Sequence, residues 1–252
     1  MSKKVLMFLM CMFLVTIGCA CTSAENTTEN SSSGASTKLE IKSTYLIEES
    51  GENLISIKLP TDYKFNETQN AFIADFASSK INEIGDETFK LTNSETSPEY
   101  SQNYSGYYIN LESKTSYVSN DMISIIFTGL FNKKSAAHPS DILFSLNFNP
   151  STLDIVEFSS LHIIDDTLYD EFVMQGEKQI LEETDNVWPN GWDGFSKTLC
   201  SKETFFEGLN NKNSNIEWYY TENGIVFSYS VPFALGDHKE VELERSILKK
   251  DR

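Results

Sequence analysis

Three histidines, His138, His162 and His238, are the side chains of this 252-residue sequence best suited to bind a metal or to move protons near neutral pH. None has a second histidine or a cysteine at the spacing that a zinc site uses, so the sequence predicts no metal site. His138 lies between two apolar runs, in a segment expected to form a loop, and loops often carry functional residues. It is therefore a candidate ligand-binding residue, although a turn or packing role is more common for such a histidine.

Two tryptophans form a second candidate site. Trp188 and Trp192 flank the polar segment Pro189-Asn190-Gly191, and their rings could stack on sugar rings. Core packing is the usual role of such rings, but the polarity of this segment favours exposure. We therefore take Trp188 and Trp192 as candidate ligand contacts.

Catalytic motifs are not found in the sequence. It holds no pattern typical of a serine hydrolase, a zinc protease or a nucleotide-binding loop, and the adjacent carboxylates Asp165 and Asp166 are explained as helix caps. The sequence thus predicts a protein that is not an enzyme, with no catalytic residue and no cofactor. A glycosidase pair of carboxylates that meet only in the folded chain stays open as an alternative.

The N-terminus predicts export from the cytoplasm. Lys3 and Lys4 precede the apolar run Val5–Ile17, and Gly18 and Cys19 follow it, as in a secretory signal peptide. The apolar run is shorter than the roughly 20 residues that span a bilayer, so a permanent anchor must come from elsewhere.

Thr16-Ile17-Gly18-Cys19 resembles the bacterial lipobox, in which the cysteine is acylated and becomes the first residue of the mature protein; the usual leucine is replaced by Thr16. Two acyl chains are enough for stable anchoring. We therefore predict lipidation at Cys19, the alternatives being that Cys21 or no cysteine is modified.

Charge restricts the class of partner. The net charge is −17; removal of residues 1–18 takes away two lysines and leaves 18 basic against 37 acidic residues, a net charge of −19. Such acidity argues against nucleic acid and anionic lipid as partners, and fits either a basic protein or simple solubility. Cys200 is the one cysteine expected in the folded part, and its pairing with Cys21 stays open.

Hydrophobic periodicity predicts the elements that position these residues. Period-2 alternation marks strands, and apolar residues at helical spacing between capping residues mark two helices. The predicted fold class is α+β, with an antiparallel sheet packed by two main helices. The expected elements are two strands within Lys38–Leu59, a helix capped by Asn66 and Gly85, a strand at Tyr107–Leu111, a hairpin of Ile123–Phe131 and Ile142–Phe148, a helix from Asp165 or Asp166 to about Asn186, a helical turn at Phe205–Leu209, a hairpin of Ile216–Tyr220 and Ile225–Val231, and a last strand at Val241–Leu243.

Three segments carry a family resemblance. They are the entry Thr44–Phe76, the turn Ala137-His138-Pro139, and the closing segment Trp218–Leu248. In these segments the chain resembles the extracytoplasmic region of RsiV-type anti-sigma factors, which also precedes the catalytic domain of PdaC-type peptidoglycan deacetylases. Ser135-Ala136 stands where the family has two glycines before its Ala-His-Pro turn. The resemblance implies a binding or sensor module for lysozyme or peptidoglycan, without the anti-sigma segment or the deacetylase domain.

The expected organisation follows from these points. We expect a lipoprotein signal peptide at 1–18, a flexible tether at 19–37, a PdaC-type strand–helix half at 38–120 and an RsiV-like half at 121–252. The predicted function is a binding or sensor module, lipid-anchored on the extracytoplasmic face of the cell membrane. Its expected partners are the membrane and either lysozyme or peptidoglycan, with no nucleic acid. An envelope glycan hydrolase and a purely structural lipoprotein are the alternatives.

The lipidation prediction can be tested directly. We expect the Cys19→Ser variant to lose incorporation of a palmitate analogue and to leave the membrane fraction, whereas Cys21→Ser keeps both properties. Metabolic labelling followed by fractionation measures this. Acylation of the Cys19→Ser variant would contradict the assignment.

Overall fold

The computed structural model describes residues 44–99, 104–183, 200–210, 216–231 and 237–248. Ile41–Arg252 form one unit by their contacts, so the two sheets described below belong to one body. The predicted signal peptide and tether, with Cys19, lie outside the described residues, and their predicted roles stay predictions.

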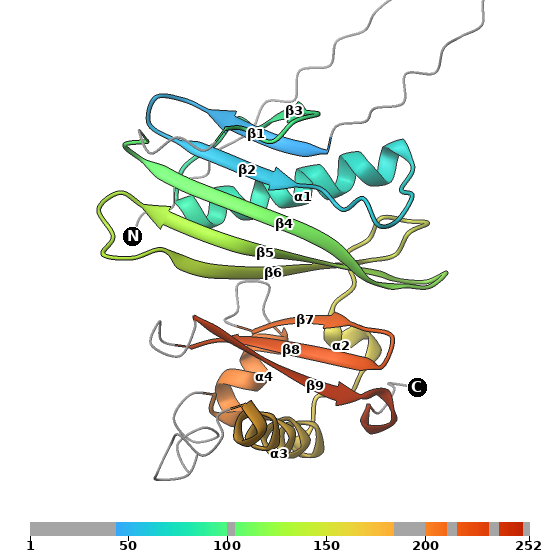
Figure 1. The fold of residues 1–252 in the computed structure, drawn as a ribbon. Helices are drawn as coiled ribbons and strands as arrows, with labels where there is room; N and C mark the ends of the chain where they lie inside the picture. The colour runs from blue at the N-terminus through green and yellow to red at the C-terminus, as the bar shows by residue number, and fades with distance from the viewer. Residues whose placement is uncertain (1–43, 100–103, 184–199, 211–215, 232–236, 249–252) are drawn as a thin grey trace, which may run out of the picture. The chain divides into compact units, whose positions relative to one another are not determined.

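A six-stranded sheet with helix α1 (Glu67–Gly85) on one face forms the first part of the fold (Figure 1). Its strand order is β3-β1-β2-β4-β5-β6, and neighbours pair antiparallel except β2 and β4, which are parallel. Because α1 lies in the connection between the two parallel strands, it forms the crossover that such a pair requires. The strands are β1 Tyr45–Glu49, β2 Leu54–Lys58, β3 Thr92–Ser94, β4 Tyr107–Val118, β5 Ile123–Lys133 and β6 Ser140–Phe148.

Helix α1 begins as the sequence predicts. The side chain of Asn66 accepts a hydrogen bond from the Gln69 amide at 2.9 Å, and Gln69 Oε1 accepts one from the Asn66 amide at 3.1 Å. This capping box satisfies two backbone donors that the helix itself leaves without partners. The predicted end needs a correction, because Gly85 is the last helical residue and Asp86 takes the left-handed conformation, with φ 53°.

The first core lies between α1 and the sheet. Alternate residues of the strands point to the helix, as period-2 patterning requires. The rings of Phe127 and Phe144 stack with centroids 4.8 Å apart. Fully or nearly fully buried members of this core include Ile55, Ile57, Ile73, Ala77, Ile81, Ile109, Leu111, Ile123, Ile125, Phe127, Leu146 and Phe148.

A three-stranded antiparallel sheet, in the order β7-β8-β9, forms the second part together with helices α2, α3 and α4 (Figure 1). Its core is aromatic and includes Phe158, Phe172, Phe205, Phe227 and Tyr229. The elements are α2 Phe158–Leu161, α3 Asp166–Glu183, α4 Lys202–Asn210, β7 Ile216–Tyr220, β8 Gly224–Ser230, β9 His238–Glu244 and a 3₁₀ turn at Arg245–Ile247.

Two residues of the second part answer questions left by the sequence. Asp165 is the cap of α3, since its Oδ1 accepts a hydrogen bond from the Leu168 amide at 3.0 Å. Cys200 is a free thiol, 1% exposed, and burial raises its pKa to about 12. A thiol in that state reacts slowly.

The α+β class is confirmed, with helices α1 and α3 as its two long helices. The sequence did not predict strand β3, the parallel pairing of β2 with β4, or the division of the strands into two sheets. Strand β4 lies in the predicted half 38–120 and strand β5 in the predicted half 121–252, and the two strands pair along their length. The six-stranded sheet therefore takes strands from both of the halves predicted from the sequence. The predicted end of the second helix, near Asn186, lies outside the described residues.

Candidate functional site

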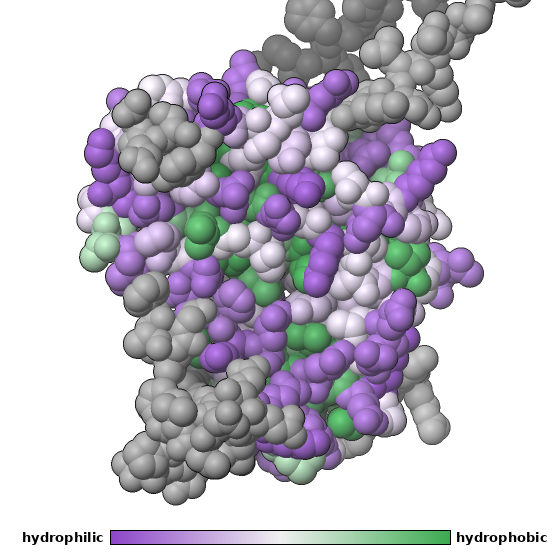
Figure 2. Space-filling model, in the orientation of Figure 1, coloured by the Kyte–Doolittle hydropathy of each residue, from purple (hydrophilic) through white to green (hydrophobic). Residues whose placement is uncertain are grey.

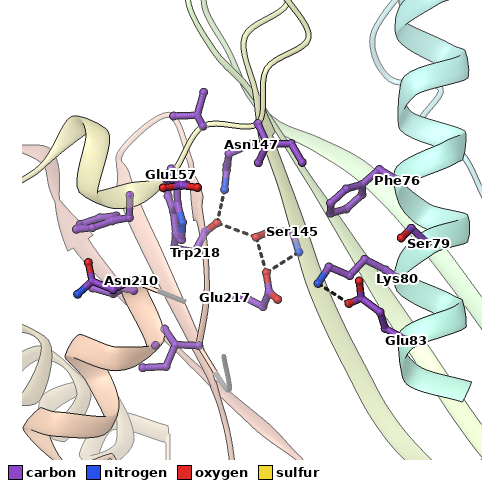
Figure 3. Close-up of a pocket in the computed structure, with 16 residues that line it drawn as sticks. Phe76, Ser79, Lys80, Glu83, Ser145, Asn147, Glu157, Asn210, Glu217 and Trp218 are labelled. Carbon is purple, nitrogen blue, oxygen red and sulfur yellow. Dashed lines mark hydrogen bonds and ion pairs between the residues drawn. The ribbon is translucent and has the colours of Figure 1, made fainter. Parts of the chain in front are cut away.

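A pocket with a cavity volume of about 310 Å³ lies where the first part of the fold meets the second (Figure 3). One wall comes from α1 and β6, and the other comes from β7, α4 and the chain around the start of α2. Its lining residues are Phe76, Ser79, Lys80, Glu83, Ser145, Asn147, Ile155, Val156, Glu157, Phe158, Gly208, Leu209, Asn210, Ile216, Glu217 and Trp218.

The polar face of β6 builds one side of this pocket. In the segment Phe144–Phe148, three apolar side chains enter the first core, whereas Ser145 and Asn147 point to the opposite face. Both polar side chains are nevertheless buried, at 9% and 4% exposure. Buried polar groups require hydrogen-bond partners, and here strand β7 supplies them.

The partner of these side chains is the backbone of β7. Asn147 Nδ2 donates to the Trp218 carbonyl oxygen at 2.7 Å, and Ser145 Oγ lies 2.8 Å from the same oxygen. The Tyr220 amide donates to Ser124 Oγ at 3.3 Å, and Ser124 Oγ in turn donates to Asn147 Oδ1 at 2.7 Å. Strand β7 is an edge strand of its sheet, so these side chains satisfy backbone groups that β8 does not reach.

Carboxylates of the second part satisfy the edge of β6 in the same way. Glu217 Oε2 accepts a hydrogen bond from the Ser145 amide at 3.0 Å, and Asp237 Oδ2 accepts one from the Asp141 amide at 2.6 Å. Because β6 is the last strand of its sheet, both amides belong to an edge strand. The two sheets thus cap each other's edge strands, and this arrangement places Glu217 at the pocket.

Glu217 has an unusual electrostatic environment. Burial raises the pKa of its carboxyl above the ordinary value of 4.5, and the hydrogen bonds from Ser145 and the charge of Lys80 oppose this increase without cancelling it. Lys80 itself forms an ion pair with Glu83 at 2.9 Å on α1, across the pocket from Glu217 (Figure 3).

Aromatic rings form much of the remaining wall. Phe158 is fully buried and Trp218 is 9% exposed, with their ring centroids 5.4 Å apart in an edge-to-face arrangement. Phe76 of α1 lies on the opposite wall. Helix α4 approaches β7 closely because Gly208 has no side chain: a Cβ atom there would lie 2.8 Å from Ile216 Cδ1. A bulkier residue at Gly208 would therefore push this wall outward.

The site residues predicted from the sequence are not part of this pocket. His138 is exposed at the tip of the β5–β6 hairpin, where its Nδ1 lies 3.2 Å from the Pro139 carbonyl oxygen, and it does not line the cavity. Trp188 and Trp192 lie outside the described residues. The tip histidine therefore stays a separate candidate.

A buried histidine of the second part has a packing environment. His162 is 5% exposed, its Nε2 forms a hydrogen bond with the Tyr220 hydroxyl, and its ring centroid lies 5.1 Å from that of Phe158. Burial raises the pKa of Tyr220 to about 12, although the nearby Arg245 charge opposes this. Both groups are therefore part of the aromatic core next to the pocket rather than of its lining.

Sequence reasoning missed Glu217, Ser145, Asn147 and Trp218 as site residues. A weak signal was present, because Ser145 and Asn147 interrupt an otherwise apolar strand. Their partner Trp218 is more than 70 residues away along the chain, however, and local patterning cannot pair such distant segments.

The described part of the chain contains no group of three or more His, Cys, Asp or Glu side chains that could hold a metal ion. Among its helices none has the length and apolar character to cross a bilayer.

Comparison with known proteins finds no matching family model and no matching curated protein. Among solved structures, a DUF3298 family protein from Pseudomonas aeruginosa PAO1 is similar with a TM-score of 0.48 and 11% identity, over 78% of this chain and 85% of that one. A member of the same family from Bacteroides fragilis NCTC 9343 is similar with a TM-score of 0.38 and 12% identity, over 78% and 83% of the two chains. The resemblance to RsiV-type and PdaC-type proteins stays a prediction.

The environment of Glu217 predicts how stability depends on pH. Because folding raises the pKa of Glu217, the folded state holds the proton more tightly than the unfolded state does. The contribution of Glu217 to stability is therefore greatest at pH values below its pKa in the unfolded state, and it is lost as pH rises through its pKa in the folded state. The side-chain amide of a Glu217→Gln variant cannot ionise, so we expect the variant to match the wild type in acid and to exceed its free energy of unfolding at higher pH. Urea unfolding across this pH range measures the difference. A variant less stable than the wild type at neutral pH would show that the ionised carboxylate is the preferred partner of Ser145.

Proposed function

We propose that this chain is a non-enzymatic binding module of the bacterial cell envelope, lipid-anchored through Cys19 on the extracytoplasmic face of the membrane, with the pocket as its ligand site. The ligand that we propose is a short segment of peptidoglycan. The observation that carries this proposal is the pocket itself, in which aromatic rings and hydrogen-bonding side chains from both parts of the fold line one cavity.

The chemistry of the lining fits a glycan. A sugar presents a C–H face, which packs on an aromatic ring, and hydroxyl edges, which require fixed donors and acceptors. The pocket offers the ring of Phe76, which is half-buried, and that of Trp218, which is 9% exposed, and polar groups that include Asn210 and Glu157 at its rim. The resemblance to peptidoglycan-contacting and lysozyme-binding proteins supports a role in the cell envelope, and so does the predicted lipobox.

The test uses soluble fragments of peptidoglycan and the full chain in detergent. Ser79 is exposed and lines the pocket, so a tryptophan there would fill the cavity without entering the core. We expect Ser79→Trp to weaken binding about tenfold or more, a loss of roughly 1.4 kcal/mol, in isothermal titration calorimetry. Ser79→Ala, the matched control, should bind as the wild type does.

His138→Ala separates this pocket from the site predicted at the hairpin tip. Because His138 does not line the cavity, we expect that variant to bind normally. Loss of binding in His138→Ala, with normal binding in Ser79→Trp, would move the ligand site to the hairpin tip. Release of sugar products during the titration would instead favour the hydrolase alternative.

A basic protein such as lysozyme is the second candidate partner. The observation in its favour is the net charge of −17. Hydrophilic residues cover most of the face shown in Figure 2, and apolar residues form small separate patches on it. On β9, Glu240, Glu242 and Glu244 are all exposed.

We expect the chain to capture lysozyme at low salt and to release it at high salt, since charge steering of this kind is screened by ions. A pull-down at two ionic strengths measures this, with an acidic protein of similar size as the control. Capture that salt does not change would contradict the electrostatic account.

A further inference from the structure

We propose that the pocket selects ligands that carry a primary ammonium group, and that Glu217 receives this group. The inference rests on the proposed role of the pocket as the ligand site and adds the chemical class that the site prefers. It goes beyond a glycan contact in general, because an ordinary acetylated sugar carries no positive charge.

The charges of the lining give the first argument. Among the described residues that line the pocket, the charged side chains are Lys80, Glu83, Glu157 and Glu217. Lys80, the cation of this set, lies 2.9 Å from Glu83 and is therefore already paired. Glu217 adds a further carboxyl group to this pair, and among the described lining residues the structure places no second cation beside it.

Hydrogen-bond geometry at Ser145 gives the second argument. Its single hydroxyl proton has two acceptors at 2.8 Å, Glu217 Oε2 and the Trp218 carbonyl oxygen, and can serve only one of them at a time. A neutral Glu217 also resolves the competition, because its hydroxyl can donate a hydrogen bond to Ser145 Oγ while Ser145 Oγ donates to the Trp218 carbonyl oxygen. The geometry thus accommodates a protonated carboxyl group as well as an ionised one.

This arrangement lets the carboxyl lose its proton at little structural cost. Asn147 Nδ2 also donates to the Trp218 oxygen, at 2.7 Å, so Ser145 can turn to the ionised Glu217 without leaving that oxygen unsatisfied. The Ser145 amide also donates to Glu217 Oε2, at 3.0 Å, and this bond does not depend on how the Ser145 hydroxyl is turned. A ligand ammonium would stabilise the carboxylate and release the proton to solvent, with charge conserved in the pocket.

The walls suit an ammonium group as well. The faces of aromatic rings attract cations, and Phe76 and Trp218 supply partly exposed rings to the cavity, whereas Phe158 is fully buried. A charge-assisted hydrogen bond to Glu217 would then fix the position of the ligand nitrogen.

Two matched pairs of probes test the inference and distinguish the source of the amine. Chitotriose against tri-N-acetylchitotriose represents a sugar amine, and Nα-acetyl-lysine amide against its Nε-acetylated form represents a peptide amine. We expect the amine of at least one pair to bind about tenfold more tightly than its acetylated partner, as a charged hydrogen bond in a pocket provides. Calorimetry at one pH in two buffers, phosphate and HEPES, should also show proton release. The binding enthalpies measured in the two buffers should differ, because the buffer takes up the released proton.

Two variants with the same change of net charge complete the experiment. Glu217→Gln should abolish both the preference for the amine and the proton release. Glu112→Gln removes an exposed carboxylate of β4 outside the pocket and should keep both. Thermal unfolding of each variant confirms that it is folded.

The outcomes separate this inference from the proposed function. Peptidoglycan fragments that bind while amine and acetylated probes bind equally would overturn the inference and leave the proposed function standing. Amine-selective binding that Glu217→Gln removes, without any binding of peptidoglycan fragments, would support the inference and overturn the glycan ligand. A preference for the amine that survives in Glu217→Gln, or binding of none of the probes, would overturn the inference.

Discussion

The buried hydrogen bonds between β6 and β7 are the interaction on which the arrangement of this protein depends. Each part of the fold has a hydrophobic core of its own, and the apolar cluster that joins strands of both sheets consists of Ile126, Tyr219 and Val226. Much of the contact is polar, through Asn147, Ser145 and the backbone of Trp218. An unsatisfied buried polar group costs about 1–3 kcal/mol, so these groups specify one position of β7 against the larger sheet.

The same constraint solves the problem of unpaired strand edges. Strands β6 and β7 each end a sheet, and exposed edges invite pairing with other chains. Side chains rather than a continuous ladder satisfy their backbone groups, and Asp62 does the same for β4 beyond the end of β2, accepting from the Thr115 amide at 2.8 Å. A side chain that bonds to a neighbouring strand holds the two backbones farther apart than a direct backbone hydrogen bond does. The two sheets are therefore not forced into one continuous layer, and room for a pocket remains beside Glu217.

Structure and candidate function are therefore linked through one residue. Glu217 caps the edge of β6, lines the pocket and carries a pKa raised by burial. A ligand that changes its protonation would act on a group that also holds the two parts together. Binding at this position would therefore be coupled to the contact between the two parts.

The sequence by itself determined the local elements. The cap at Asn66, the alternation around Phe127 and Phe144, and the hairpin of Ile216–Tyr220 and Ile225–Val231 each depend on neighbours within a few residues, and the structure confirms the helix and both hairpins. Local signals also placed the second helix and the last strand. Only the tertiary structure decided the parallel pairing of β2 with β4 and the separation into two sheets, because these depend on contacts between distant segments. The pocket belongs to the same class: Ser145 and Glu217 are 72 residues apart, and neither residue type signals a site until the fold brings them within hydrogen-bond distance.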